Sequence, residues 1–476
     1  MNTNTELDRI VEGFLEDRVA APPRPDVLRD AIKHVSVTPQ ARRRFLGRWL
    51  DRDEGAGRRT TEHDHPPNTN RRTRLMLSAT GITAVLAIIA LSVNVFDADP
   101  TVPGQAGTTH VVAADGTGDF ATIQDAVDAA ADGDTISVTP GRYEGTVTID
   151  RDITLRGDGP RDQIVVVAPS GEATAADDLE EAGRPHGLLI DGSTAKVSDL
   201  TVEVSPDSTG IGSIGGSPSI ERVTLINTGP EPVDEWDDSY YALGFYGAGE
   251  PTIRDSEWNG YVAVRGGADA LFEGNTISSD GISVDGPATS VVRDNSFRDG
   301  GWVNSTGAAI TVEGNDFAAG RVSLDSQATG EVRDNVFRDH STDWPEGAIS
   351  LYDLGTEALV EDNKVSRADN GIWVTEGATA DIRGNVLDAH RIGIHLGHGV
   401  GATVRGNTIG GEGAGILITR GSDASVTGNT VDVAARGIAI SAGSSPTVSG
   451  NDVCGEMESI WVHDSATPEL SDNKVC

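Results

Sequence analysis

The chain has 476 residues, a net charge of −37 and two cysteines, which is enough sequence for two or more ordinary domains or for one long repeat domain. The first 74 residues are slightly basic, so the negative charge belongs to the remainder of the chain. A body this acidic argues against nucleic acid as a partner, because it repels a phosphate backbone. It fits a soluble surface, a saline medium or the binding of cations.

Residues 1–74 are expected to form a short helical arm in the cytoplasm. Amphipathic helices are predicted over residues 7–18, 26–35 and 39–50, and the polar stretch 51–72 is typical of disorder. Such an arm either sets the membrane topology or binds a cytoplasmic partner, and we prefer the first interpretation.

The segment 75–96 has 22 residues without a charge, which is long enough for a helix to cross the hydrocarbon core of a membrane. Basic residues precede this segment and acidic residues follow it, namely Arg71, Arg72 and Arg74, then Asp97 and Asp99. Because positive flanks stay in the cytoplasm, we expect a single-pass protein of the cell membrane with residues 97–476 outside the cell. A buried core helix is the alternative, and residues 97–109 are typical of a linker.

The next segment, "VVAADGTGDFATIQDAVDAAADGDTISVTPGRYEGTVTI", begins at Val111 and predicts a strand, a helix and a second strand. Phe120, Ile123, Val127 and Ala130 follow helical spacing, and Asp119 or Thr122 can cap the start of the helix. The segment resembles the beginning of pectin methylesterases and of related right-handed parallel β-helix proteins. The resemblance implies an all-β solenoid over residues 110–476, with this helix capping its N-terminal end.

The same resemblance does not extend to the catalytic motifs. Pectin methylesterases carry Gly-x-Tyr-x-Glu after this helix, whereas "GRYEG" here places Gly145 where the glutamate is expected. Their later motifs, which hold two catalytic aspartates and an arginine, are absent, so we expect no esterase activity. Gly397-His398-Gly399 matches one motif of polygalacturonases, but the accompanying motifs of that family are incomplete.

An asparagine returns at fixed intervals of 20 residues, then 28, then five times 22. Periods of this length predict a solenoid, and the short apolar runs between turns predict strands, giving a parallel β-helix of about 12–14 coils, which the resemblance implies is right-handed. We expect each asparagine to occupy a left-handed turn position and to bond its neighbours on adjacent coils. The repeated residues are Asn275, Asn295, Asn315, Asn335, Asn363, Asn385, Asn407, Asn429, Asn451 and Asn473.

A charged residue lies two positions before most of these asparagines, and its sign alternates along much of the series. Adjacent coils place equivalent residues about 4.8 Å apart, so alternating signs predict a surface ladder of ion pairs rather than a catalytic arginine. The series is Arg254, Glu273, Arg293, Glu313, Arg333, Glu361, Arg383 and Arg405.

Outward positions of another strand series supply the candidate binding residues. Most members of this row are small, but Trp373 and His395 are large and adjacent, and we expect them to be exposed. An exposed tryptophan among charged hydrogen-bonding groups is typical of a sugar-binding groove. The row was assigned as Ala263, Ser283, Val303, Ser323, Trp373, His395, Leu417, Ala439 and Trp461, and the charged neighbours as Glu376, His398, Arg420, Asp369 and Arg391.

Two longer excursions interrupt the period and carry aromatic residues among carboxylates. Their candidate sugar contacts are Trp236, Tyr240 and Trp344. Carboxylates in such loops also suit calcium. We predict no metal site at His390, His395 and His398, because His395 and His398 need not point the same way. We also predict no cofactor.

The two cysteines, Cys454 and Cys476, are separated by one 22-residue repeat and follow their asparagines by the same interval. Stacked coils would hold their Cα atoms about 4.8 Å apart, which is within the range of a disulfide. We therefore predict a disulfide between them.

Three functions remain open from the sequence. The leading hypothesis is a membrane-anchored extracytoplasmic β-helix that binds a polysaccharide or cell-surface glycan, with or without a divergent processing activity. The enzyme alternative is a polysaccharide lyase or a glycosidase. The third is a non-catalytic structural or accessory surface protein.

Overall fold

The computed structural model describes residues 107–170, 184–205, 208–228, 241–342 and 346–476. The cytoplasmic arm and the membrane span predicted from the sequence lie outside these residues, as do Trp236, Tyr240 and Trp344. Within the described part of the chain, no helix is long and apolar enough to span a membrane.

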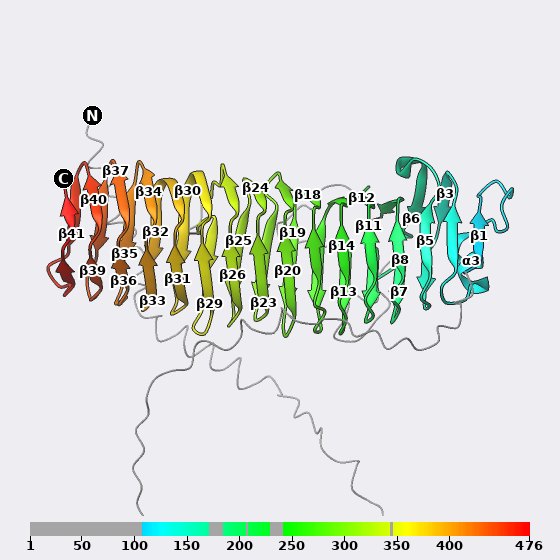
Figure 1. Cartoon of the computed structure of the whole chain (residues 1–476), viewed down its shortest axis with the longest axis horizontal. Helices are drawn as coiled ribbons and strands as arrows, with labels where there is room; N and C mark the ends of the chain where they lie inside the picture. The colour runs from blue at the N-terminus through cyan, green and yellow to red at the C-terminus, as the bar shows by residue number, and fades with distance from the viewer. Residues whose placement is uncertain (1–106, 171–183, 206–207, 229–240, 343–345) are drawn as a thin grey trace, which may run out of the picture. The chain divides into compact units, whose positions relative to one another are not determined.

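From Thr109 onward the chain winds into a parallel β-helix whose coils stack side by side (Figure 1). Equivalent strands of successive coils form three stacks, here called columns A, B and C. Each regular coil contributes one strand to column A, then a turn, then one strand to column B and one to column C. Column A contains β1 Thr109–Val112, β2 Thr135–Val138, β5 Thr154–Gly157, β8 Lys196–Ser198, β11 Ser219–Glu221, β14 Thr252–Arg254, β17 Leu271–Glu273, β20 Thr289–Arg293, β23 Ala309–Glu313, β26 Thr329–Arg333, β29 Glu357–Glu361, β31 Thr379–Arg383, β33 Gly401–Arg405, β36 Ser425–Thr427, β39 Thr447–Ser449 and β42 Glu469–Ser471.

Columns B and C are joined into one sheet because β30 and β32 run through both columns. Column B contains β3 Gly141–Glu144, β6 Ile164–Val167 (preceded by the 3-10 turn η1 Arg161–Gln163), β9 Thr201–Val204, β12 Thr224–Asn227, β15 Glu257–Asn259, β18 Thr276–Ser278, β21 Ser296–Arg298, β24 Asp316–Ala318, β27 Val336–Arg338, β30 Lys364–Val374, β32 Val386–Leu396, β34 Thr408–Gly411, β37 Thr430–Val433, β40 Asp452–Gly455 and β43 Lys474–Val475.

Column C contains the second halves of β30 and β32 together with twelve further strands. These are β4 Val147–Ile149, β7 His186–Asp191, β10 Thr209–Ile214, β13 Tyr241–Tyr246, β16 Tyr261–Arg265, β19 Gly281–Asp285, β22 Trp302–Thr306, β25 Arg321–Asp325, β28 Ile349–Leu351, β35 Ala414–Ile418, β38 Arg436–Ile440 and β41 Glu458–Val462.

The number of coils is larger than the sequence period indicated. Column A holds 16 strands, which corresponds to about 15 turns rather than 12–14. Six of these strands, from β1 to β14, belong to coils that precede the one carrying the first repeat asparagine, Asn275. The count was low because these early coils lack the asparagine that marks the later ones.

The N-terminal cap is helix α3, Ile123–Ala129, as the sequence predicts. Thr122 caps it by accepting a hydrogen bond from the backbone N–H of Asp125 at 3.1 Å. The helix buries Ile123, Ala126 and Val127 against the first coils, so their apolar interior is covered at this end.

The interior of the coils is a continuous apolar core of inward-facing Val, Ile, Leu and Phe side chains. Equivalent residues stack from coil to coil. Phe297, Phe317 and Phe337 show this most clearly, with ring centroids 4.4 and 4.6 Å apart in nearly parallel planes. Burying one such side chain fully is worth about 1.5–3 kcal/mol, so the core supplies the main stabilisation of the fold.

The asparagine ladder forms between columns A and B, inside the turn. Each side-chain amide donates to the Oδ1 of the next asparagine at 2.9–3.0 Å, and that Oδ1 also accepts the backbone N–H of the preceding asparagine. Nine of the ten residues are buried, and Asn473 is half-buried. The prediction that the asparagine itself is left-handed was wrong: the preceding residue, such as Gly274 or Asp294, has the positive φ.

The charge ladder on the outside of column A is confirmed. Glu273 lies between Arg254 and Arg293, at 2.7 Å from each. The two arginines that break the alternation, Arg383 and Arg405, are not left to repel each other. Both reach Asp381, at 3.3 and 3.1 Å.

The predicted disulfide is also confirmed. Cys454 and Cys476 are bonded, and their Cα atoms lie 5.3 Å apart. The pairing of Val453 with Val475 places the two cysteines at successive levels of column B. The coil register deduced from the asparagines is therefore correct at this end of the chain.

The excursions from the regular coil share one location. The ranges 171–183, 206–207, 229–240 and 343–345 each fall between a column B strand and the following column C strand. These four excursions thus all enter at one edge of column C, which makes the outward face of this column the best-placed surface for a site.

Candidate functional site

The outward face of column C, here called the C-face, consists of alternate residues of its strands. Strand pairing arranges them in three rows that run from coil to coil. In the central coils, row 1 contains Tyr261, Gly281, Trp302 and Arg321. Row 2 contains Ala263, Ser283, Asn304, Ser323, Ser350, Trp373, His395 and Leu417, and row 3 contains Arg265, Asp285, Thr306, Asp325, Tyr352, Thr375, Gly397 and Thr419.

Trp373 and His395 are stacked neighbours in row 2, as predicted, with ring centroids 3.8 Å apart. The expectation that this tryptophan is exposed was wrong, since each of the two side chains is only 4% exposed. Trp373 therefore offers no open ring on which a sugar could stack. Large aromatic groups on a sheet face bury one another when they occupy equivalent positions on adjacent strands.

The buried His395 belongs to a polar cluster with Thr419 and His398. Its Nε2 lies 3.2 Å from the hydroxyl of Thr419, and Nδ1 has no hydrogen-bond partner. Burial lowers the pKa of His395 to about 3, and the nearby His398 and Arg420 act in the same direction. His395 is therefore neutral near pH 7, which suits a packed structural role.

His398 has a defined tautomer. Arg420 donates to its Nε2 at 2.6 Å, so Nδ1 carries the proton and donates to the hydroxyl of Thr375 at 2.9 Å. Glu376, His398 and Arg420 occupy equivalent positive-φ turn positions on successive coils. They lie at the row 3 edge of the C-face.

Asp369 and Arg391 are not brought into this cluster, because they lie at the row 1 edge of the face. Asp369 accepts hydrogen bonds from the hydroxyl of Ser341 and the backbone N–H of Thr342, both at 3.0 Å. Arg391 is exposed. The candidate residues of the sequence are thus divided between two edges, with a buried pair between them.

The structure presents a different aromatic pair on the C-face, which the sequence interpretation missed. Tyr261 and Trp302 lie in row 1, both half-exposed, with ring centroids 5.8 Å apart. Gly281 separates them in the row, and a Cβ atom at this glycine would lie 2.1 Å from the backbone carbonyl oxygen of Trp302 and 2.5 Å from its Cδ2. The absence of a side chain at Gly281 therefore lets the indole lie against Tyr261.

The assignment of outward residues in this coil was wrong by one position. Val303 was placed in the outward row, but it pairs with Ile282 and is buried, whereas Asn304 pairs with Ser283 and faces outward. The detectable signal was an aromatic residue following glycine in both "GYVAV" and "GWVNS", where the other coils have glycine, a small residue or, in one coil, Arg321.

Polar groups surround the aromatic pair on the side of rows 2 and 3. Asn304 donates to the hydroxyl of Thr306 at 3.1 Å. Asp285 accepts from the hydroxyl of Ser283 and from Arg265, both at 3.0 Å. The C-face therefore combines half-exposed aromatic rings with amide, hydroxyl and carboxylate groups.

Asp325 ends strand β25 in row 3 and is half-buried. Burial raises its pKa, hydrogen bonds from Ser326 and Thr306 oppose this, and the neighbouring carboxylates Asp353 and Asp285 raise it further. The electrostatic potential at Asp325, at this end of the C-face, is therefore negative.

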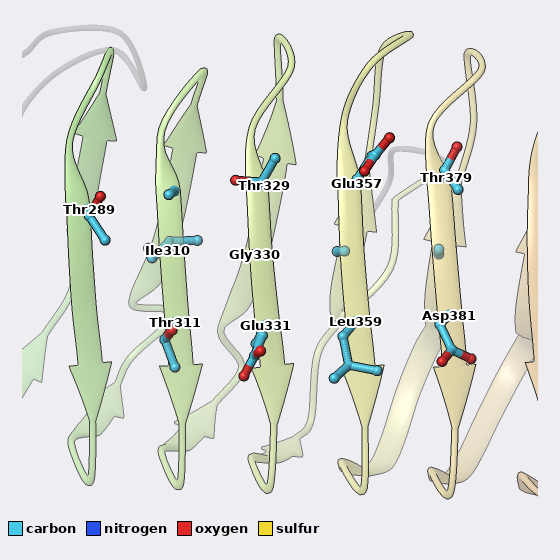
Figure 2. A pocket seen from close by; sticks show the side chains of 13 residues that line it. Thr289, Ile310, Thr311, Thr329, Gly330, Glu331, Glu357, Leu359, Thr379 and Asp381 are labelled. Carbon is cyan, nitrogen blue, oxygen red and sulfur yellow. The ribbon is translucent and has the colours of Figure 1, made fainter. Parts of the chain in front are cut away.

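A hollow with a volume of about 520 Å³ lies on the outward face of column A. Figure 2 shows two rows of side chains along it, with Gly330 between them. One row contains Thr289, Thr329, Glu357 and Thr379, and the other Thr311, Glu331, Leu359 and Asp381. No aromatic residue lines this hollow, and part of its charge is already paired with the arginine ladder, so the C-face is the better candidate for a sugar site.

No group of three or more His, Cys, Asp or Glu side chains within the described ranges is arranged to hold a metal ion. Because the two excursions that carry the loop carboxylates lie largely outside those ranges, the compatibility of those loops with calcium stays a prediction.

Comparison with known proteins identifies the fold family. The family model "Right handed beta helix region" matches residues 186–341, 252–387 and 320–475, which together span more than half of the chain. The search of curated proteins found no match.

Several solved structures are similar to this chain at low identity. The periplasmic alginate epimerase AlgG is 12% identical, with a TM-score of 0.47 over 70% of this chain and 85% of that chain. Pectin methylesterase from carrot is 12% identical (TM-score 0.36, 56% and 85% covered), and PemA from Erwinia chrysanthemi is 13% identical (0.35, 56% and 90%). At these identities and scores the likenesses carry no argument about activity.

Proposed function

The chain belongs to the right-handed β-helix family, and from this premise we propose that it is a membrane-anchored extracytoplasmic protein that binds a polysaccharide on its C-face. The observation that carries the proposal is the half-exposed pair of Tyr261 and Trp302 beside the polar groups of rows 2 and 3. Aromatic rings supply a large apolar contact at low entropic cost, and adjacent hydroxyl, amide and carboxylate groups bond the ring substituents of a sugar.

The location follows from two further features. The uncharged segment 75–96 has the length and the flanking charges of a membrane span with its N-terminal side in the cytoplasm. The disulfide between Cys454 and Cys476 is of the kind that persists in an oxidising compartment. Both favour a β-helix displayed outside the cytoplasm.

The role of the loop residues is part of the same proposal. Insertions enter the C-face at the row 1 edge, where Tyr261 and Trp302 lie, so Trp236, Tyr240 and Trp344 belong to segments whose ends adjoin this edge. Among the candidates at the row 3 edge, His398, Arg420 and Glu376 would bond the far side of a ligand that crosses the face. Asp369 and Arg391 would serve the near side.

The proposal is tested by binding of the full-length chain, held in lipid nanodiscs, to an array of polysaccharides. We expect Trp302→Ala to weaken binding at least about tenfold, which corresponds to ~1.4 kcal/mol. Gly281→Ala should also weaken binding, because the added methyl group clashes with both the backbone carbonyl and the indole of Trp302 and so forces them to move. Trp461→Ala is the matched control: this tryptophan is also half-exposed, but it lies in the last strand of the C-face, under Arg436.

Two results would count against the proposal. If no polysaccharide binds, the results would favour the alternative of a non-catalytic structural or accessory surface protein. Binding that is unchanged in Trp302→Ala and Gly281→Ala would move the site away from the C-face. Release of unsaturated or reducing ends from a bound polysaccharide would instead favour the lyase or glycosidase alternative.

A further inference from the structure

We infer that the polysaccharide taken by the C-face is built from amino sugars whose amino groups are free and positively charged. The inference rests on the proposed function and specifies its ligand. It comes from the combination of an aromatic pair at one edge of the face with carboxylates at the other edge that have no cationic partner among the described residues.

Two carboxylates in this part of the C-face take no part in its ion pairs. Arg265 pairs with Asp285 at 3.0 Å, and Arg321 pairs with Glu346 at 3.5 Å. No ion pair within the described ranges involves Asp325 or Asp353. The two residues are close in the structure, since the carboxylate of Asp353 accepts the backbone N–H of Ser326 at 3.1 Å.

An uncompensated pair of this kind is costly in the free protein and is relieved by a cation. Asp325 is half-buried, so water screens its charge poorly, and Asp353 adds to the negative potential that it experiences. An ammonium group placed between the two carboxylates can donate up to three hydrogen bonds, which are stronger than those of a neutral donor. A neutral hydroxyl gains less there, and a uronate would add a further negative charge.

The dimensions of the face require a ligand longer than one sugar ring. Rows 1 and 3 are four residues apart, which is about 13 Å along a strand. A ligand that contacts Trp302 therefore reaches Asp325 only through further units. A polymer of amino sugars offers both contacts, a ring for the indole and an ammonium group for the carboxylates, and its positive charge is attracted by a chain of net charge −37.

The test compares two oligomers with the same backbone. Binding of the full-length chain in nanodiscs is measured by calorimetry with the hexamer of glucosamine and with the hexamer of N-acetylglucosamine, at a pH at which the free amino groups are protonated. A galacturonic acid hexamer serves as the acidic comparison. We expect the glucosamine hexamer to bind at least about tenfold more tightly than the acetylated one, with the uronic acid oligomer weakest.

Three variants assign this preference to the two carboxylates. Asp325→Asn and Asp353→Asn should each reduce the preference to about threefold or less, while leaving binding of the acetylated hexamer within about twofold. Asp472→Asn removes the same charge from an exposed residue of the last coil, several coils away from Asp325 along the stack, and should leave the preference unchanged. Because both aspartate variants are measured, the test still gives an answer if one of them folds poorly.

The outcomes separate the inference from the function on which it rests. Equal binding of the two glucosamine-based oligomers, with both lost in Trp302→Ala, would overturn the amino-sugar ligand and leave polysaccharide binding intact. An equal effect of Asp472→Asn and Asp325→Asn would overturn the assignment to the C-face. Absence of binding to all three oligomers and to the polysaccharide array would overturn both proposals.

Discussion

Removing one asparagine from the middle of the ladder should destabilise the β-helix far more than removing one from its end. Asn363 donates to the carbonyl of Val332 at 2.7 Å and to Asn385 at 3.0 Å, and it accepts from the backbone and side chain of Asn335 at 3.1 and 3.0 Å. In Asn363→Ala, the buried N–H of Asn335 and the carbonyl of Val332 lose these partners. At about 1–3 kcal/mol for each buried group, the expected loss is about 2–6 kcal/mol.

The matched control is Asn473→Ala at the end of the ladder. Asn473 makes the same kinds of hydrogen bond to Asn451 and to Val448, but it is half-buried, so water can replace the lost partners. We expect a loss of about 1 kcal/mol there. Urea denaturation of the two variants, followed by far-ultraviolet circular dichroism, measures both values. Equal losses would refute the argument that burial decides the contribution of each rung.

Two other predictions concern acid and the disulfide. The pKa of His395 is about 3 in the folded protein and about 6.5 when the chain is unfolded, so between these values the unfolded chain binds more protons and the free energy of unfolding falls as the pH is lowered. His395→Phe should therefore lose less stability than the parent between pH 6.5 and pH 4, by up to about 3 kcal/mol, and parallel pH profiles of the two proteins would contradict this. Replacing Cys454 and Cys476 by serine should speed hydrogen exchange over residues 452–475, reflecting a loss of up to about 3 kcal/mol from the closed 22-residue loop; exchange at the parent rate would show that stacking alone holds this coil.

The features of the fold that repeat along the chain could be predicted from the sequence. The asparagine period located the ladder and the disulfide, because equivalent residues on stacked coils must lie one strand spacing apart. The charge series predicted ion pairs for the same reason. The period could not count the coils before Asn275, where the connections are irregular and the marker is missing.

The candidate site was harder to predict, because exposure depends on neighbours from other coils. Trp373 was assigned to the correct row, but its burial beside His395 depends on two large rings meeting at one level. Trp302 was missed because the inward-outward alternation of a single strand can be read in two registers. In one register Val303 faces outward, and in the other Trp302 does. Strand pairing with Ile282 and Ser283 decides between the two registers, and this information is not local.

The five identical 22-residue steps from Asn363 to Asn473 have an evolutionary consequence. Along this stretch, each coil gives the next the same asparagine hydrogen bonds that it receives from the previous one. Unequal recombination that deletes or duplicates 22 residues would therefore rejoin matching surfaces and preserve every rung of the ladder. The length of the β-helix can therefore change in evolution by whole coils. Trp302, Asp325 and Asp353 lie before this stretch, so their surroundings would not change.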